Sequence, residues 1–252
     1  MKLLTLARDL QRRRARERHG MFVVEGVRAV EELVHSPIPV HGALVSSTLS
    51  GSDRGRALRA ALAARSVDVL EVGDRDFDSA AATDTPQGVL AIGEIPVRTL
   101  PALELPSRVR ILVLDAVQDP GNVGTILRTA AALGAAAVLA MPGTVDLWNG
   151  KVVRSAMGAL FHRPALSCTW GELDEFLRER ALPLWGADGE GEPLGEVVAP
   201  DALALVVGNE GAGLTPDALA RVARRVSIPI EPDVESLNVA VAAGILLFHF
   251  RP

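Results

Sequence analysis

Five polar side chains interrupt stretches of the chain that otherwise have the character of buried strand, glycine-rich turn or apolar helix. Burying a polar group without a partner costs a few kcal/mol, so a set of them in one half of a chain predicts a shared pocket. A cation and several hydrogen-bonding groups in such a pocket could hold a polar substrate and stabilise developing negative charge. The five residues are Asn122, Arg128, Glu210, Ser236 and Asn238.

The first of the three segments that hold them, residues 119–135, joins a strand-like run to a predicted helix. Asn122 stands where a helix N-cap is expected, and its amide oxygen can satisfy a free N–H group. Arg128 follows on the helix among apolar residues. Composition alone favours a cap with an exposed arginine, and a cation held at the carboxyl end of the sheet is the functional alternative; both interpretations stay open at this point.

The other two segments contain the remaining polar residues. In VVGNEGAGL (206–214) the glycines around Glu210 allow the backbone to approach a ligand closely, although a tight turn needs the same residues. In residues 228–248, Ser236 could be a helix N-cap. Asn238 falls inside a predicted apolar helix, where an amide needs partners on more than one side, and this position favours a functional role.

The elements that must position these side chains divide into two halves. The first half, up to about Glu94, alternates strand-like segments rich in Val, Ile and Leu with helical segments, which is typical of a small α/β domain. The stretch 95–106, with three prolines, predicts a linker. We expect strands at 22–26, 43–47, 67–72 and 88–94, and helices at 27–36 and 54–65.

The second half predicts an open α/β sheet with mostly parallel strands. It opens with RILVLDAV (110–117), which is nearly continuously apolar, as strands buried on both faces of a parallel sheet are. Ligands of such sheets bind beyond the carboxyl ends of the strands, and the polar residues fall at or just after these ends. Further strands are expected at 136–142, 182–187, 202–208 and 225–230, and helices at 123–133, 150–157, 171–180, 215–222 and 237–250.

Composition restricts the class of protein. A chain of 252 residues, 48% hydrophobic and 23% charged, can build two modest domains. The longest apolar run, 239–248, is too short to cross a bilayer, and the N-terminus lacks a signal-peptide core. The single cysteine, Cys168, excludes an internal disulfide, and the five histidines show no ligand spacing. These features predict a cytosolic protein without a metal site.

A basic cluster near the N-terminus contrasts with the net charge of −5. Residues 1–28 contain eight Lys or Arg and three Asp or Glu, so this segment alone carries +5. Such a cluster is expected of an edge that binds RNA phosphates, and a solvated basic face is the alternative. The candidate RNA contacts are Arg12, Arg13, Arg14, Arg16 and Arg18.

Taken together, the three segments resemble the three motifs of the SpoU/TrmH family, the S-adenosylmethionine-dependent RNA ribose 2′-O-methyltransferases of the SPOUT class. The first half, with EGVRAVEEL and TDTPQGVLAI, looks like the small RNA-binding domain that many members carry. Pro232 departs from the family pattern, because many members have glycine in this loop, and Gly150 stands where proline is frequent. The resemblance covers the second half through LDAVQDPGNVGTILRTAAALGA, GTVDLWNGKVVRSAMGALFHRP, VVGNEGAGL and IPIEPDVESLNVA.

The resemblance implies an N-terminal RNA-binding substrate domain at 1–95, a linker at 96–107 and a methyltransferase domain at 108–252. In that last domain the C-terminal chain would thread a trefoil knot, and the knotted domain would form a homodimer. S-adenosylmethionine would be the cofactor, held largely by backbone groups of Gly208, Ile228 and Leu237. The implied catalytic group is Asn122, Arg128, Glu210, Ser236 and Asn238.

The implied reaction is attack of a ribose 2′-hydroxyl on the activated methyl group. We expect Arg128 to stabilise the developing alkoxide and to grip the adjacent phosphate, since a guanidinium is a reluctant base. We expect Asn122, Ser236 and Asn238 to fix Arg128 and the ribose, and Glu210 to orient a loop or a polar partner.

RNA rather than DNA is the expected substrate, because only RNA has the 2′-hydroxyl. Ribosomal RNA is favoured over transfer RNA, since the two-domain form resembles rRNA-modifying members. A nicotinamide-dependent oxidoreductase is a second class, disfavoured because no G-x-G-x-x-G follows a first strand. A non-catalytic RNA-binding module is a third, disfavoured by the intact polar set.

Overall fold

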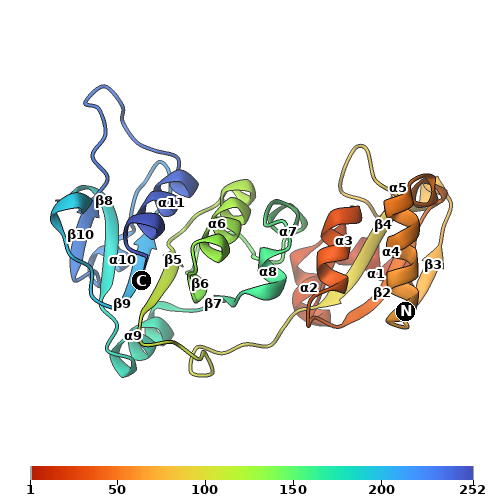
Figure 1. Cartoon of the computed structure of the whole chain (residues 1–252), viewed down its shortest axis with the longest axis horizontal. Helices are drawn as coiled ribbons and strands as arrows, with labels where there is room; N and C mark the ends of the chain where they lie inside the picture. Colours follow the sequence, from red (N-terminus) through yellow and green to blue (C-terminus); the bar gives the residue numbers. More distant parts are fainter. Residues whose placement is uncertain (1, 252) are drawn as a thin grey trace. The chain divides into compact units, whose positions relative to one another are not determined.

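In the computed structural model, which describes residues 2–251, the chain forms two compact units (Figure 1). The first unit comprises the described residues up to Val97 together with Trp148–His162. The second comprises Arg98–Leu147 and the described residues from Arg163 onwards. Trp148–His162 thus belongs to the first unit, although in sequence it lies between two strands of the second. No helix within residues 2–251 is long and apolar enough to cross a membrane.

The first unit is built on a mixed four-stranded sheet with the order β1-β4-β2-β3. Strand β4 is antiparallel to both of its neighbours, whereas β2 and β3 are parallel. The elements are α1 (Leu3–Asp9), α2 (Arg13–His19), β1 (Met21–Glu25), α3 (Val27–Val34), β2 (Val40–Val45), the 3-10 helix η1 (Ser47–Gly51), α4 (Asp53–Ala64), β3 (Val69–Glu71), α5 (Asp74–Asp78), β4 (Val89–Glu94), α7 (Gly150–Ser155) and α8 (Ala159–His162).

Aromatic packing explains why the segment of α7 and α8 belongs to the first unit. The ring of Phe22 on β1 lies 4.4 Å from that of Trp148 and 5.8 Å from that of Phe161, between centroids. Phe22 and Phe161 are fully buried. Large aromatic side chains contribute much apolar area and favour such tilted pairs, so this cluster attaches the segment to β1.

The second unit is a six-stranded sheet with the order β10-β8-β9-β5-β6-β7, in which every strand pair is parallel. Strand β5 lies inside the sheet and all six of its residues are buried, as its continuous apolar run predicts. The elements are β5 (Val109–Leu114), α6 (Pro120–Ala132), β6 (Ala137–Ala140), β7 (Ala165–Ser167), α9 (Trp170–Glu179), β8 (Leu184–Pro193), the 3-10 helix η2 (Leu194–Glu196), β9 (Ala202–Val207), α10 (Pro216–Leu219), β10 (Arg224–Ser227) and α11 (Val239–His249).

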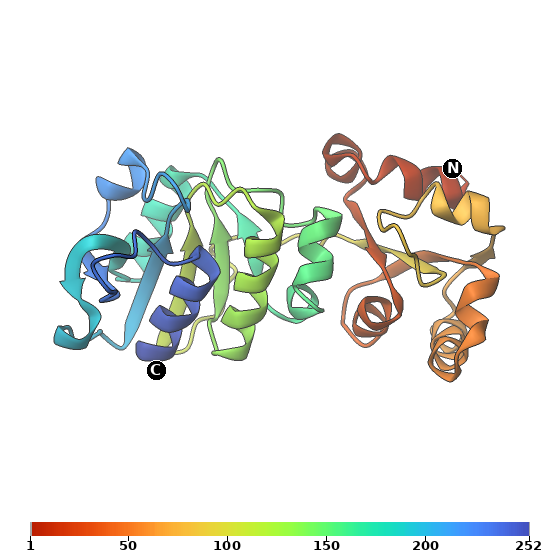
Figure 2. The same ribbon diagram turned by 90° about the horizontal axis from the view of Figure 1, so that it is seen from above.

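Helices cover this sheet and complete its core. Helices α6 and α11 lie side by side on one face (Figure 2). The main hydrophobic cluster packs Ile111 and Val113 of β5 with Phe176 of α9 and Ala218 of α10. A mixed first domain followed by a parallel α/β sheet confirms the predicted fold class. The trefoil knot stays a prediction.

Several short elements have no counterpart in the sequence prediction: α1, α2, α5, α8 and β7. Each contains seven residues or fewer. A helix of two turns or less shows too few repeats of its apolar face to be recognised by periodicity. Packing reveals α1, whose Leu6, Ala7 and Leu10 enter the core of the first unit.

Candidate active site

Helix α6 places Asn122 in its first turn, just beyond the carboxyl end of β5. The N-cap is Asp119, whose carboxylate accepts the N–H of Asn122 at 2.8 Å, and Pro120 begins the helix. Proline suits this first position, because its fixed φ is helical and its missing N–H would have no partner there. The predicted cap role of Asn122 is therefore wrong, and its side-chain amide can bond to other elements.

Helix α11 begins at Val239, two residues later than predicted, and its N-cap is Asn238. The Asn238 Oδ1 accepts the N–H groups of Ala240 at 2.9 Å and Val241 at 3.3 Å. The prediction of Asn238 inside the helix is wrong, and so is a cap role for Ser236, which precedes the helix. A cap uses only the oxygen of the amide, so the Asn238 nitrogen stays available for another bond.

The two asparagines and Glu210 form one hydrogen-bonded set from three elements. The Asn122 Nδ2 donates to Glu210 Oε1, and the Asn238 Nδ2 donates to Asn122 Oδ1 at 3.0 Å. A carboxylate can only accept at one end, and the N–H groups of α11 can only donate at the other. The orientation of both amides is thereby determined, and residues 116 positions apart in sequence act as one group.

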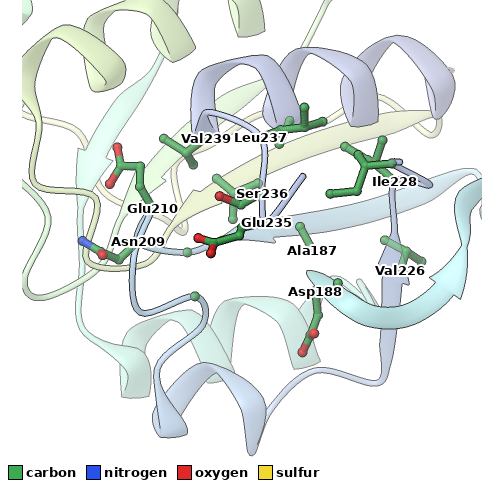
Figure 3. A pocket seen from close by; sticks show the side chains of 16 residues that line it. Ala187, Asp188, Asn209, Glu210, Val226, Ile228, Glu235, Ser236, Leu237 and Val239 are labelled. Carbon is green, nitrogen blue, oxygen red and sulfur yellow. The ribbon is translucent and has the colours of Figure 1, made fainter. Parts of the chain in front are cut away.

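A cavity of about 200 Å³ lies beside Glu210 of this set, at the carboxyl end of β9 and next to the middle of β8 (Figure 3). The three predicted cofactor residues, Gly208, Ile228 and Leu237, all line it. Glu210 and Ser236 line it as well, so two of the predicted catalytic residues share this cavity with them. Its other lining residues include Ala187, Asp188, Asn209, Val226, Glu235 and Val239.

The wall that carries Glu210 is a closed loop between β9 and α10. Asn209 and Gly213 exchange two backbone hydrogen bonds of 2.9 Å, and Asn209 Oδ1 accepts the N–H of Gly211 at 3.0 Å. A Cβ atom on Gly208 would lie 2.2 Å from the Gly213 oxygen, which no side chain could tolerate. The glycines thus form a tight turn, and the turn itself holds Glu210 at the cavity.

A fully buried carboxylate, Asp115, lies beneath this loop. It follows β5 and accepts the Thr215 N–H at 2.7 Å and the Thr215 hydroxyl at 3.1 Å. Burial raises the pKa of Asp115, since a low dielectric disfavours the charged form, while the bonds from Thr215 lower it. Asp115 was not among the predicted site residues, although an acidic side chain within the apolar run 110–117 was a usable signal.

The cavity also has an acidic lining. Besides the predicted Glu210, it includes Asp188 and Glu235, which were not among the predicted site residues. Asp188 is paired with Arg225 at 3.1 Å, which holds that carboxylate in place. Carboxylates beside an apolar cavity favour a ligand that carries positive charge. The glycine-rich stretch 186–195 around Asp188 was the available signal.

Arg128 is not part of the hydrogen-bonded set. It is exposed on α6, makes no hydrogen bond or ion pair with any other residue in 2–251, and does not line the cavity. The prediction that Asn122, Ser236 and Asn238 fix Arg128 is therefore wrong for the single chain. Its guanidinium is presented to solvent from the same helix that holds Asn122.

The N-terminal arginines divide into two kinds. Arg12, Arg13, Arg14 and Arg18 are exposed, which suits a phosphate-binding surface. Arg16 is buried, and its guanidinium donates to the carbonyl oxygens of Leu10 and Gln11 at 2.9 Å. The prediction of an RNA contact at Arg16 is wrong, because this side chain links α2 to the end of α1.

Two further kinds of chemistry find no support in the described part of the chain. No group of three or more His, Cys, Asp or Glu within residues 2–251 could hold a metal ion. Burial raises the pKa of the Cys168 thiol to about 12, so the thiol stays protonated at neutral pH. Cys168 lies 3.8 Å from the Met141 sulfur and packs as a small core residue.

A parallel sheet with a loop-walled cavity at the carboxyl ends of its strands defines the class of α/β proteins that bind a ligand there. Within this class, the chain belongs to the SpoU rRNA methylase family, whose model matches residues 110–248. The model of the MRM3-like substrate binding domain matches residues 5–91.

Individual relatives match over almost the whole chain. The chain is 35% identical to the 23S rRNA (guanosine(2553)-2′-O)-methyltransferase RlmP of Bacillus subtilis, over 97% of this chain and 94% of that protein. The structure of the SpoU methyltransferase AviRb from Streptomyces viridochromogenes in complex with AdoMet has a TM-score of 0.89 at 27% identity, covering 99% and 96% of the two chains. An AdoMet-bound rRNA methyltransferase from Sinorhizobium meliloti has a TM-score of 0.87 at 26% identity, covering 99% and 94%.

Proposed function

We propose that the protein transfers a methyl group from S-adenosylmethionine to a ribose 2′-hydroxyl in ribosomal RNA. The observation that carries the proposal is the bonded set of Asn122, Glu210 and Asn238, because Glu210 also lines the cavity. A fixed polar group at the wall of the cavity can position a hydroxyl for reaction. The family and the names of its full-length relatives support the substrate class.

The cavity residues fit S-adenosylmethionine in two respects. Ile228, Leu237 and Val239 offer apolar surface for a nucleoside, and Glu235 offers negative charge for a cation. When bound, this cofactor supplies an electrophilic methyl group on a positively charged sulfur. The AdoMet complexes of structures that share the fold support the same assignment.

Arg128 is the group that we assign to the RNA at the reacting sugar. A hydroxyl is a poor nucleophile, so its developing charge must be stabilised. A guanidinium remains protonated at neutral pH and therefore acts as a cation rather than as a base. Because Arg128 is exposed and has no partner among residues 2–251, it can bind a phosphate or the alkoxide oxygen. Glu210, Asn122 and Asn238 would orient the ribose.

The first unit is proposed to bind the RNA outside the methyl-transfer site. It contains 15 basic and 13 acidic side chains, a charge of +2, whereas the second unit has 11 and 18, a charge of −7. The exposed Arg12, Arg13, Arg14 and Arg18 would contact phosphates. Replacing these four with Gln should weaken RNA binding and lower its salt dependence by roughly 0.7 per lost contact on single strands, and an unchanged slope would contradict the assignment. An rRNA substrate would place the protein in the cytoplasm.

A second copy of the chain is proposed to cover an apolar surface on α6 and α11. Val241 and Phe248 of α11 are 51% and 57% exposed, and an open groove of about 520 Å³ runs between them and Thr125 and Thr129 of α6. Contiguous exposed apolar surface marks an interaction site. The family resemblance supports a homodimer through this domain.

The proposed function is tested by methyl transfer to RNA from cells that lack the protein. Purified protein with isotope-labelled S-adenosylmethionine should label one nucleotide of 23S rRNA at its 2′-oxygen, mapped by mass spectrometry. Transfer RNA in a parallel reaction serves as the comparison substrate. Calorimetric titration should show binding of S-adenosylmethionine and no binding of NAD. Label on transfer RNA alone would show that the substrate is transfer RNA rather than ribosomal RNA. Absence of any label would favour the alternative of a non-catalytic RNA-binding module.

A further inference from the structure

A second polar pocket lies wholly within the first unit, formed by three segments that are distant in sequence. It has a volume of about 280 Å³, near the lower end of the range for small-ligand sites, roughly 300 Å³. Its lining comes from the turn between β1 and α3, the loop before β4, and α7 with the turn that follows it. The residues that matter are Glu25, Arg28, Thr85, Gln87, Arg154 and Met157.

Glu25 holds the three segments together. Its side chain is 3% exposed and accepts the Ala82 N–H at 2.8 Å and the Thr83 hydroxyl. Arg154 of α7 lies 3.7 Å from the same carboxylate. A buried carboxylate is stable only with such partners, so the pocket wall is fixed before any ligand arrives.

The groups that face the opening have donors left over. Gln87 Oε1 accepts the Val27 N–H at 2.8 Å, while its Nε2 has no acceptor within residues 2–251. Arg28 and Thr85 are exposed and have no hydrogen-bond partner in the same described range. The lining contains two guanidiniums and an amide but one carboxylate, and that carboxylate already accepts donors from its own unit. The pocket therefore favours an anion.

Met157 adds an apolar wall on an unusual backbone. It lies in the turn between α7 and α8 and has a φ of +50°, a backbone conformation that residues other than glycine rarely adopt. Strained residues persist where the surrounding structure holds them, and they concentrate at binding sites. An apolar face beside donors suits a nucleotide, which has a base plane as well as a phosphate.

We propose that this pocket binds a phosphodiester group and its nucleotide in the RNA substrate, at a place separate from the methyl-transfer cavity. The site rests on the proposed function for its ligand, since the RNA is the substrate named there. Arg28 and Arg154 would bind the phosphate, Gln87 and Thr85 would donate to the nucleotide, and Met157 would pack on the base.

The test is RNA binding by the full chain with Arg28→Glu, with Arg75→Glu as the matched control. Arg75 is exposed in the same unit, outside the pocket lining, and the charge change is identical. The probe is in vitro transcribed 23S rRNA, with affinity measured between low and moderate salt. Arg28→Glu should weaken binding at least about tenfold and lower the salt slope by about 1, whereas Arg75→Glu should leave both nearly unchanged.

Gln87→Glu provides a second test that keeps the fold. The new carboxylate can still accept the Val27 N–H, but it replaces the free donor with negative charge. We expect weaker RNA binding with an unchanged melting temperature and unchanged affinity for S-adenosylmethionine. Equal effects of Arg28→Glu and Arg75→Glu, or full RNA affinity in Gln87→Glu, would contradict the proposal that this pocket binds RNA.

These outcomes are distinguishable from failure of the proposed function. If the wild-type chain transfers no methyl group to any RNA, the methyl-transfer assay fails while the binding measurements still report on the pocket. If methyl transfer succeeds and both pocket variants bind RNA normally, only the pocket is wrong.

Discussion

At the scale of single residues, the site depends on which atoms of each polar group are already used. The Asn238 oxygen accepts N–H groups at the N-terminus of α11, and its side-chain nitrogen donates to Asn122. Asn122 in turn donates to Glu210. Arg128 differs because its guanidinium has no partner in residues 2–251, so it can meet a substrate without breaking an existing bond. This difference separates the groups that are bonded to one another within the site from a group that is free to bind a substrate.

Arg128→Ala should therefore lower methyl transfer strongly without affecting the fold. Loss of a group that stabilises charge in a reaction costs about a hundredfold or more in turnover, roughly 3–4 kcal/mol. Stability should stay within about 0.5 kcal/mol of wild type, because the side chain is exposed and unbonded. Single-turnover kinetics measures the rate of methyl transfer, calorimetric titration measures the affinity for S-adenosylmethionine, and thermal unfolding measures stability. Full activity would remove Arg128 from the assignment.

Asp115→Ala tests the buried carboxylate beneath the loop. Losing the acceptor of the Thr215 N–H and hydroxyl should lower the free energy of unfolding by about 1–3 kcal/mol. Burial raises the pKa of Asp115, so its stabilising contribution is complete below its unfolded pKa, about 3.9, and declines as pH rises through the folded pKa. Urea unfolding of both proteins from pH 4 to pH 8 should show a shrinking difference. A difference that grows with pH would contradict the raised pKa.

At the scale of elements, helix starts decide where the polar side chains lie. The N-cap Asp119 and the first helical residue Pro120 lie three and two residues before Asn122, which places that amide on the first turn of α6, where it bonds to Glu210 in the loop after β9. Asn238 starts α11 and leaves Ser236 in the segment that lines the cavity. A shift of one residue in either start would turn these side chains by about 100°, since a helix has 3.6 residues per turn.

Asn238→Asp and Asn238→Ala separate capping from the bonded set. Aspartate keeps the oxygen that caps α11, but it replaces the Nδ2 donor with a second oxygen. Two acceptor oxygens then face each other, and the hydrogen bond to Asn122 Oδ1 is lost. We expect Asn238→Asp to retain stability and to lose activity, whereas Asn238→Ala should lose both, with about 1 kcal/mol of stability from the cap. Chemical denaturation and methyl-transfer rates would be compared. Wild-type activity in Asn238→Asp would show that the contact with Asn122 has no role.

At the scale of the whole molecule, charge and apolar surface are divided between the two units. The first unit is positive and the second negative, which matches one unit that binds RNA and another that binds a cationic cofactor. The exposed side chains of α11 add a third surface, which would be buried in a homodimer. Each of these features lies on a different part of the chain, so substitutions can remove one of them without changing the other two.

Val241→Glu with Phe248→Glu should convert the proposed homodimer to a monomer. Two carboxylates on this surface would be desolvated at the interface, at a cost that exceeds the lost apolar contact. Light scattering coupled to size-exclusion chromatography measures the mass, and Leu219→Glu, 43% exposed on α10, is the matched control. A wild-type chain that is monomeric at micromolar concentration would contradict the homodimer.

Much of the fold and of the site could be predicted from local pattern. The apolar run of β5, the glycines of the 206–214 loop and the alternation of strands with helices are local properties, and all appear in the structure as expected. The three residues that the family resemblance implies for the cofactor, Gly208, Ile228 and Leu237, line one cavity in the structure.

Other features depend on contacts that no sequence pattern encodes. Arg16 is buried because its guanidinium donates to the carbonyl oxygens of Leu10 and Gln11, although the nearby Arg14 and Arg18 are exposed. Trp148–His162 joins the first unit because its aromatic rings meet Phe22.

The amino-acid sequence by itself determined the class of the fold and the identity of the polar residues, because both follow from local periodicity and side-chain chemistry. Only the tertiary structure decided which of those residues bond to one another. Asn122, Glu210 and Asn238 meet because parallel strands bring their carboxyl ends to the same edge, however far apart they lie in sequence.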